Sequence, residues 1–599
     1  MRQQDVIDGA GSDVHPGCGG CACKCAHQGI GGVNEYVTSA AKYHGRTAEV
    51  FSGERIAGSK DDQVHEGQAY RPPHDTAMSS VPYSPMMDRG SDRWKSVGGG
   101  VALATAALTA LAHAQTPANL ANALRPATDP AAQLQTLLNF QDAEYRREFF
   151  ANTPIAERIL MDYGGYFRYG FSEVDDSSSQ AQYLNTYDAR LYGRVEIDSY
   201  ARFFGRLRIE YNDWNTIGDF SASGEGWQVP IGEIYWAEID LSNWMAAQDG
   251  ATREWTAKAR IGRQYVMWAN GLTLADYMYA ATADASFGAV ALSGLAGITA
   301  GHDTIDWDTS RTGYDTNTDR FYLGGKVDCR LGAHVPFAYA LAQWDQNAGQ
   351  TEMLPGGVPA DFQVETKFNY ESQYWGTGIN GVLAGDVIYR IEFAVETGTT
   401  LSDPIKHDSS LPPDELGRPQ KTVPILSEAG LVGVSWLARD SSDARVDFQM
   451  LAGSGSVYRL DSGNTYGGID PGKTDTAFNS LGYVNTGLVL APEASNMVIP
   501  SFTLSFNPFK GIDGLSETRF SGTAFLYTRF DADAPISVPT NFGGSNLVGS
   551  EYDFNIDVRI FGDLNTSFRY GVFVPNSSLF TDTESQPRQF IYVGATYAF

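Results

Sequence analysis

The chain has 599 residues, of which 12% are aromatic, 19% are charged and 64 are glycine. Abundant glycine and aromatic residues with few charges favour β-strands over helical domains. The formal net charge of −28 argues against nucleic acid as a partner, because proteins bind nucleic acid through basic surfaces. Four of the five cysteines lie within residues 18–25, which excludes a disulfide framework in the rest of the chain.

The first element in chain order is a predicted secretory signal over residues 86–114. Three basic residues precede an apolar run at 97–111, which is too short to cross a bilayer as a helix. Two small residues, Ala112 and Ala114, then form a cleavage site. Because such a signal is N-terminal, residues 1–85 are interpreted as an upstream segment from a start assigned too early. No later stretch has the pattern of a transmembrane helix, which leaves a soluble exported protein or an outer-membrane barrel.

Residues 115–158 are predicted to be a periplasmic linker followed by a short helix at 130–150, where leucine and aromatic residues recur at near-helical spacing. Beyond Ile159 the period changes to two. Runs of about ten residues with one apolar face are longer than the strands of most soluble proteins and long enough to cross a bilayer at a tilt. Charges on the opposite face fit a water-filled lumen. Residues 159–599 are therefore predicted to form an all-β, antiparallel transmembrane barrel, and the alternative is a soluble β-helix or sandwich.

Short and long connections alternate along the barrel, as they do in bacterial outer-membrane barrels. The alternation predicts about 18 strands, with 16 as the alternative, and places both termini in the periplasm. The short connection at 269–270 breaks the rule, and without the strand 271–281 beside it the even number fails. The predicted strands are 159–173, 183–198, 201–214, 231–244, 253–268, 271–281, 287–300, 319–330, 335–345, 367–383, 386–398, 426–439, 443–453, 498–510, 517–530, 551–562, 565–575 and 589–599.

The last residue, Phe599, ends an alternating strand. A terminal aromatic residue in this position is typical of barrels that the outer-membrane assembly machinery inserts. We therefore expect that machinery, outer-membrane lipid and lipopolysaccharide as partners.

Three motifs resemble the alginate-export family of outer-membrane porins. They are residues 206–211 (RLRIEY), 233–241 (EIYWAEIDL) and 260–264 (RIGRQ). After this match, residues 265–276 depart from the family pattern because they lack an arginine. The resemblance implies an 18-stranded barrel with an arginine-lined pore for an anionic polysaccharide.

Basic residues on the polar phase of neighbouring strands are the candidate solute-binding residues. Guanidinium groups stay charged and bind carboxylates in a fixed fork. These basic residues therefore fit a porin for anionic sugars or a polysaccharide such as alginate. Alternatively, these groups pair with nearby acids as struts in a general diffusion porin, or surface loops provide adhesion or hydrolysis. Neither catalysis nor a cofactor or metal is expected. A bulge at Gly262 is expected to re-aim the last of the candidates, which are Arg190, Arg194, Arg202, Arg206, Arg208, Lys258, Arg260 and Arg263.

Overall fold

The computed structural model describes residues 159–599 apart from 176–181, 215–225, 252, 301–318, 347–350, 355–362, 368, 384, 407–416, 439–441, 460–468, 539–543, 561–562 and 581–584. The predicted upstream segment, signal and periplasmic helix lie outside the described residues.

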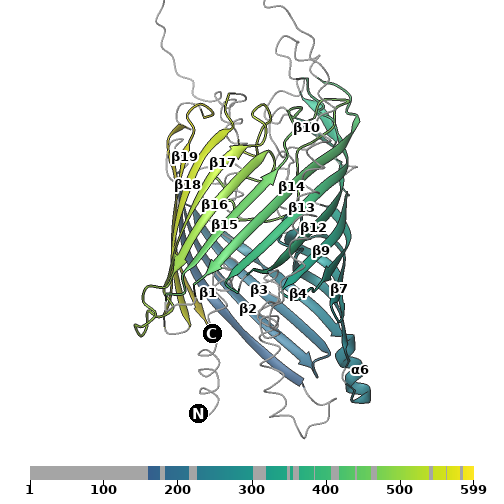
Figure 1. Cartoon of the computed structure of the whole chain (residues 1–599), viewed down its shortest axis with the longest axis vertical. Coiled ribbons are helices and arrows are strands. Elements are labelled where there is room, and N and C mark those ends of the chain that lie inside the picture. The colour runs from purple at the N-terminus through teal and green to yellow at the C-terminus, as the bar shows by residue number, and fades with distance from the viewer. Residues whose placement is uncertain are drawn as a thin grey trace, which may run out of the picture.

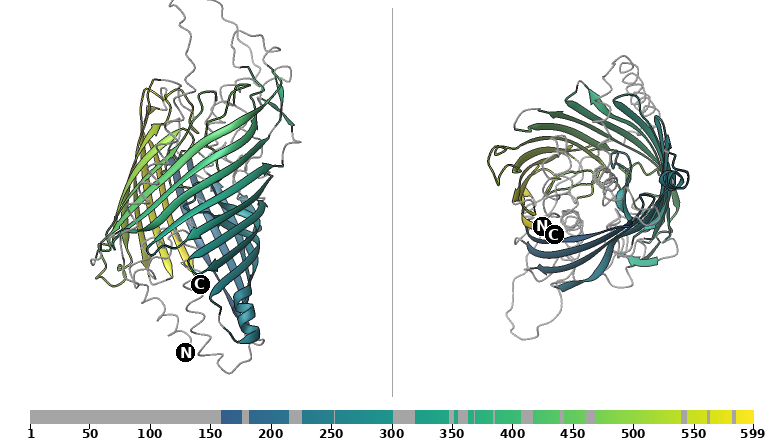
Figure 2. Two further views of the ribbon diagram at one scale, coloured as in Figure 1. Left: turned by 45° about the vertical axis from the view of Figure 1, so that its right-hand side comes forward. Right: turned by 90° about the horizontal axis from the view of Figure 1, so that it is seen from below.

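Eighteen antiparallel strands form one closed sheet (Figure 1). Each strand pairs with its neighbour in the chain, and β1 pairs with β20 to close the ring. In the view from below, the strands lie in a ring (Figure 2). The strands are β1 (Ile159–Asp175), β2 (Gln182–Ile197), β3 (Ala201–Trp214), β4 (Gly226–Asp240), β5 (Trp255–Met267), β6 (Ala275–Phe287), β7 (Val290–Thr299), β8 (Arg320–Cys329), β9 (His334–Asp345), β12 (Tyr370–Leu383), β13 (Val387–Leu401), β14 (Thr422–Leu437), β15 (Arg445–Gly453), β16 (Met497–Phe506), β17 (Arg519–Arg529), β18 (Leu547–Ile560), β19 (Leu564–Pro575) and β20 (Arg588–Ala598).

The two faces of the wall differ in polarity, as the period of two predicts. On β2 the side chains of Asp188 and Arg190 are buried, whereas those of Tyr187 and Leu191 are exposed. An apolar outer face on a closed barrel is the arrangement that lets strands cross lipid with every backbone group paired. The predicted 18-stranded transmembrane barrel is therefore confirmed, and the chain is a multi-pass outer-membrane β-barrel. No helix in the described part of the chain has the length and hydropathy to cross a bilayer.

One short helix replaces the end of a predicted strand. The strand predicted at 231–244 ends at Asp240, and α6 (Leu241–Asp249) follows it at the lower end of the barrel (Figure 1). The Asp240 carboxylate accepts a hydrogen bond of 3.0 Å from the Asn243 backbone N–H, which caps the helix. Gly250 ends the helix in a left-handed conformation. The prediction of strand at 241–244 was wrong because it overlooked this cap.

The sixth strand is also shifted from its prediction. It covers Ala275–Phe287 instead of 271–281, and the turn predicted at 282–286 lies at residues 288–289. Residues 280–286 consist largely of small side chains, so hydropathy does not mark where the strand ends. The connection predicted at 269–270 is longer than expected. It spans residues 268–274, which we call the inner loop, and it folds toward the barrel axis with Trp268 and Leu274 buried.

A second connection folds inward as well. Residues 469–496, between β15 and β16, are here called the inner segment. The Ala275 N–H donates to the Leu481 carbonyl at 2.8 Å, so the inner segment lies against the inner loop. The inner segment also reaches inward-facing side chains of β12, β13, β17 and β18. The two elements therefore narrow the lumen. The region predicted as the loop 346–366 contains a hairpin of β10 (Thr351–Leu354) and β11 (Val364–Lys367).

Candidate functional site

The candidate basic residues lie on β2, β3 and β5. Cross-strand register aligns Glu196 of β2 with Arg202 of β3, Glu238 of β4 and Arg260 of β5. Residues two positions apart on one strand share a face, so the alternation of charge with apolar residues turns the charges toward the lumen. The structure places seven of the eight candidates on this inward phase: Arg190, Arg194, Arg202, Arg206, Arg208, Lys258 and Arg260.

The upper ionic cluster surrounds one buried carboxylate. Asp188 is fully buried, and its Oδ2 lies 2.7 Å from Arg168 Nη2 and 3.3 Å from Arg190 Nη2. Its Oδ1 lies 3.8 Å from Arg208 Nε. Among the described residues this cluster has four guanidinium groups and three carboxylates, which leaves one positive charge in excess. Its members are Arg168, Asp188, Arg190, Arg206, Arg208, Glu210 and Glu233.

A bulge in β4 brings Glu233 into the upper ionic cluster. The β3–β4 register shifts between Arg206 and Leu207, where Glu233 is the extra residue. A bulge re-aims a side chain and often lies beside a functional site. Here the Glu233 carboxylate lies 2.6 Å from Arg206 Nε and 3.1 Å from Arg190 Nη2. Sequence reasoning missed Glu233 as a partner because nothing in strand alternation signals the extra residue.

Arg168 was also missed in this cluster. It is the basic residue of a stretch in which Gly164, Gly165 and Gly170 hide the alternation of the strand. Its pairing with Asp188 follows from the register of β1 with β2, in which the two residues are directly opposite.

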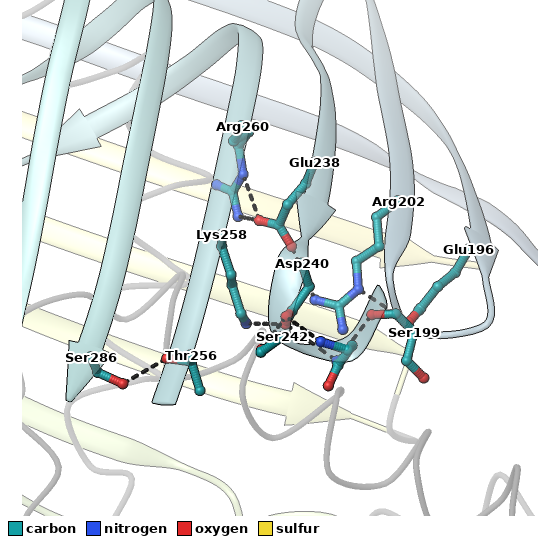
Figure 3. Close-up of polar contacts among 11 residues, drawn as sticks. Glu196, Ser199, Arg202, Glu238, Asp240, Ser242, Thr256, Lys258, Arg260 and Ser286 are labelled. Carbon is teal, nitrogen blue, oxygen red and sulfur yellow. Dashed lines mark hydrogen bonds and ion pairs between the residues drawn. The ribbon is translucent and has the colours of Figure 1, made fainter. Parts of the chain in front are cut away.

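The lower ionic cluster (Figure 3) includes Asp240, the residue that caps α6. Glu238 accepts hydrogen bonds from Arg202 Nη1 at 3.2 Å and from Arg260 Nη2 at 2.6 Å. Lys258 Nζ lies 3.7 Å from Asp240 Oδ2. The three cations of this cluster are balanced by three carboxylates. The members of the lower ionic cluster are Glu196, Arg202, Glu238, Asp240, Lys258 and Arg260.

Arg194 and Arg263 lie apart from these two clusters. Arg194 Nη2 is 3.5 Å from Asp162 Oδ2 on β1. Arg263 lies opposite Tyr235, whose side chain is exposed on the outer face, and its Nε donates to the Glu233 carbonyl at 2.9 Å. The expected bulge at Gly262 was wrong, because the β4–β5 register passes through Gly262 without a shift. The bulge is in β4 instead, and Arg263 satisfies its carbonyl.

No group of three or more histidine, cysteine, aspartate or glutamate side chains is arranged to hold a metal ion in the part of the chain that the structure describes.

No family model matches the chain, and no curated protein matches it. Solved structures with a similar barrel include OccAB1 of Acinetobacter baumannii, with a TM-score of 0.44 and 8% identity over 75% of this chain and 98% of that chain. Another is the outer membrane protein OpdK of Pseudomonas aeruginosa, with a TM-score of 0.43 and 8% identity over 74% and 98%. A third is OccK2 (OpdF) of Pseudomonas aeruginosa in complex with glucuronate, with a TM-score of 0.40 and 10% identity over 73% and 98%. The resemblance to the alginate-export family stays a prediction.

Proposed function

We propose that the chain is an outer-membrane porin through which small anionic solutes, such as sugar acids, diffuse passively. The observation that carries this proposal is the unequal exposure of the partners in the ion pairs. The side chain of Arg260 is 29% exposed but that of its partner Glu238 only 5%. Lys258 is 36% exposed and Asp240 6%. Arg206 is 17% exposed, against 6% for Glu233.

In these three pairs, a solute in the lumen therefore meets the cation before the carboxylate. Charges in a cleft with low-dielectric walls focus the field and raise the local concentration of counter-ions. Arg190, Arg202 and Arg208 are buried, so we propose that they hold the carboxylates in place, while Arg206, Lys258 and Arg260 contact the solute. Under this proposal both interpretations of the basic residues apply, because some of them bind the solute and others pair with acids as struts.

The inner loop and the inner segment narrow the lumen, which supports single sugars or short oligomers as solutes rather than a long polysaccharide. Single-channel recordings in planar bilayers test this limit, with alginate oligomers of increasing length added to the bath. We expect current blocks by long oligomers without permeation. Permeation of polymeric alginate would instead support the export function that the sequence resemblance implies. The alternative is a general diffusion porin, which would show no preference between anions and cations.

Reversal potentials across planar bilayers with a salt gradient test the proposed selectivity. We expect the wild-type channel to prefer anions, and the double change Arg206→Gln and Arg260→Gln to lower the anion/cation permeability ratio by about twofold or more. The control is Arg253→Gln, which removes one positive charge from the connection between α6 and β5 and is compared with each single change, Arg206→Gln and Arg260→Gln. A wild-type channel that prefers cations, or equal ratios in all variants, would refute the proposal.

A further inference from the structure

Three aromatic rings separate the two ionic clusters on the inner wall. Tyr192 and Phe204 have ring centroids 6.1 Å apart with planes 20° from parallel. Phe204 and Trp236 have centroids 5.6 Å apart with planes 22° from parallel. We call Tyr192, Phe204 and Trp236 the aromatic row. It crosses β2, β3 and β4, so its members come from inward positions that are otherwise occupied largely by charged residues.

Glycine residues stand at both ends of the aromatic row. Gly164 lies opposite Tyr192, and a Cβ there would be 2.9 Å from the Tyr192 hydroxyl oxygen. Gly262 lies opposite Trp236, and a Cβ there would be 2.7 Å from the Trp236 Cα. A real Cβ does not come this close to other heavy atoms, so a larger residue at either position would force its neighbours to move. Glycine therefore lets the Tyr192 hydroxyl pack against β1 and the β4 backbone at Trp236 pack against β5, which fixes the two ends of the row.

Positive charge flanks the aromatic row. The Arg260 guanidinium carbon lies 4.2 Å from the centroid of the Trp236 ring, which is a cation–π distance. Arg206 stands opposite Tyr192 on the neighbouring strand. Tyr192 and Phe204 are half-buried, and both arginines are partly exposed. The lumen thus presents ring surface next to accessible guanidinium groups.

A hexuronate combines the two chemical features that would bind to ring surface and to guanidinium groups. A pyranose ring has an apolar face of C–H groups, and a hexuronate adds one carboxylate at the ring edge. Ligand sites typically combine aromatic surface with a few placed polar groups, and a guanidinium binds a carboxylate in a bidentate fork. Rings that served only as membrane girdles would lie on the outer face instead.

We propose that the aromatic row, with Arg206 and Arg260, is a binding station for a hexuronate in the lumen. The sugar ring stacks on Phe204 and Tyr192, and its carboxylate accepts hydrogen bonds from Arg260 or Arg206. This inference rests on the proposed porin function and adds a defined place and a defined chemical class of solute to it.

Single-channel recording in planar bilayers tests the station with three probes. Glucuronate has both the ring and the carboxylate, glucose has only the ring, and acetate has only the carboxylate. We expect glucuronate to interrupt the current for longer than glucose, and acetate to cause no resolved interruption. Phe204→Leu keeps the apolar volume but removes the ring face, and it is expected to shorten the glucuronate interruptions by about fivefold or more.

The matched control is Phe203→Leu, because Phe203 is the preceding residue on β3 and its side chain is exposed on the outer face. Its interruptions should equal those of the wild type. Arg260→Gln should shorten the interruptions by glucuronate and leave those by glucose unchanged. Each variant is scored on open channels, which are folded by definition of the recording.

Two results would overturn the station: equal interruption times in Phe204→Leu and wild type, or acetate interruptions as long as those of glucuronate. If anion selectivity persists in that case, the porin proposal stands and only the station fails. If no channels form at all, the porin proposal fails with it.

Discussion

Replacing Asp188 by asparagine is expected to destabilise the barrel by about 3 kcal/mol or more. The carboxylate is 0% exposed and contacts the guanidinium groups of Arg168 and Arg190, with that of Arg208 close by. Asparagine keeps the shape of the side chain but removes its charge, so three buried cations lose a shared counter-ion. Urea unfolding of the purified protein in detergent micelles measures the change in the free energy of unfolding. The intensity of the folded band on a gel gives the folded fraction at each urea concentration.

Asp162→Asn is the matched control for this prediction. Asp162 lies on β1, its side chain is 43% exposed, and Arg194 lies 3.5 Å away. Water already solvates the Asp162 carboxylate and screens this pair, so we expect the pair to contribute about 0–1 kcal/mol and the control to leave the unfolding midpoint nearly unchanged. If the two variants lost equal stability, Asp188 would have no special role in the upper ionic cluster.

The strands and their inward faces could be predicted from the sequence because the bilayer imposes a simple rule. Lipid requires apolar side chains on every second position, and the lumen allows charge on the others. The rule was sufficient for β2 and β3, where Arg190 and Leu191 differ sharply in polarity. It was insufficient for β6, where small residues such as Ala281 and Ala283 are tolerated on either face.

The partners of the arginines could not be predicted in the same way. Which carboxylate meets which guanidinium depends on the register between neighbouring strands, and a shift of one residue changes every pairing. Glu233 joins Arg190 and Arg206 only because β4 has a bulge. The sequence is consistent with both roles for the arginines, and only the distances and burial in the structure distinguish one residue from another.

The inward path of residues 469–496 was equally beyond prediction. By length and polarity this stretch, which lies between the predicted strands 443–453 and 498–510, is typical of an outer loop. Its position depends on contacts between residues far apart in the chain. The clearest is the Glu551 carboxylate of β18, which accepts hydrogen bonds from the backbone N–H groups of Leu488, Val489 and Leu490 at 2.6, 2.8 and 2.8 Å.

Glu551→Gln is therefore expected to release part of the inner segment and to widen the channel. Glutamine matches glutamate in size, but its amide NH₂ would face N–H donors that need an acceptor. Each buried donor left without an acceptor costs roughly 1–3 kcal/mol, which favours a segment that moves into the lumen water. We expect the single-channel conductance to rise by roughly half or more, with larger current noise. Exclusion of polyethylene glycols of graded size from the open channel gives an independent measure of its width.

The control for this prediction is Asp557→Asn, on the same strand. Asp557 accepts a hydrogen bond of 2.7 Å from Ser567 Oγ on β19, so it tests the loss of a wall carboxylate that binds another strand. Its conductance should stay close to that of the wild type. Unchanged conductance and unchanged polymer exclusion in Glu551→Gln would contradict the prediction. The packing of Leu488 against Phe590 and Tyr592 would then be sufficient to hold the inner segment without the carboxylate.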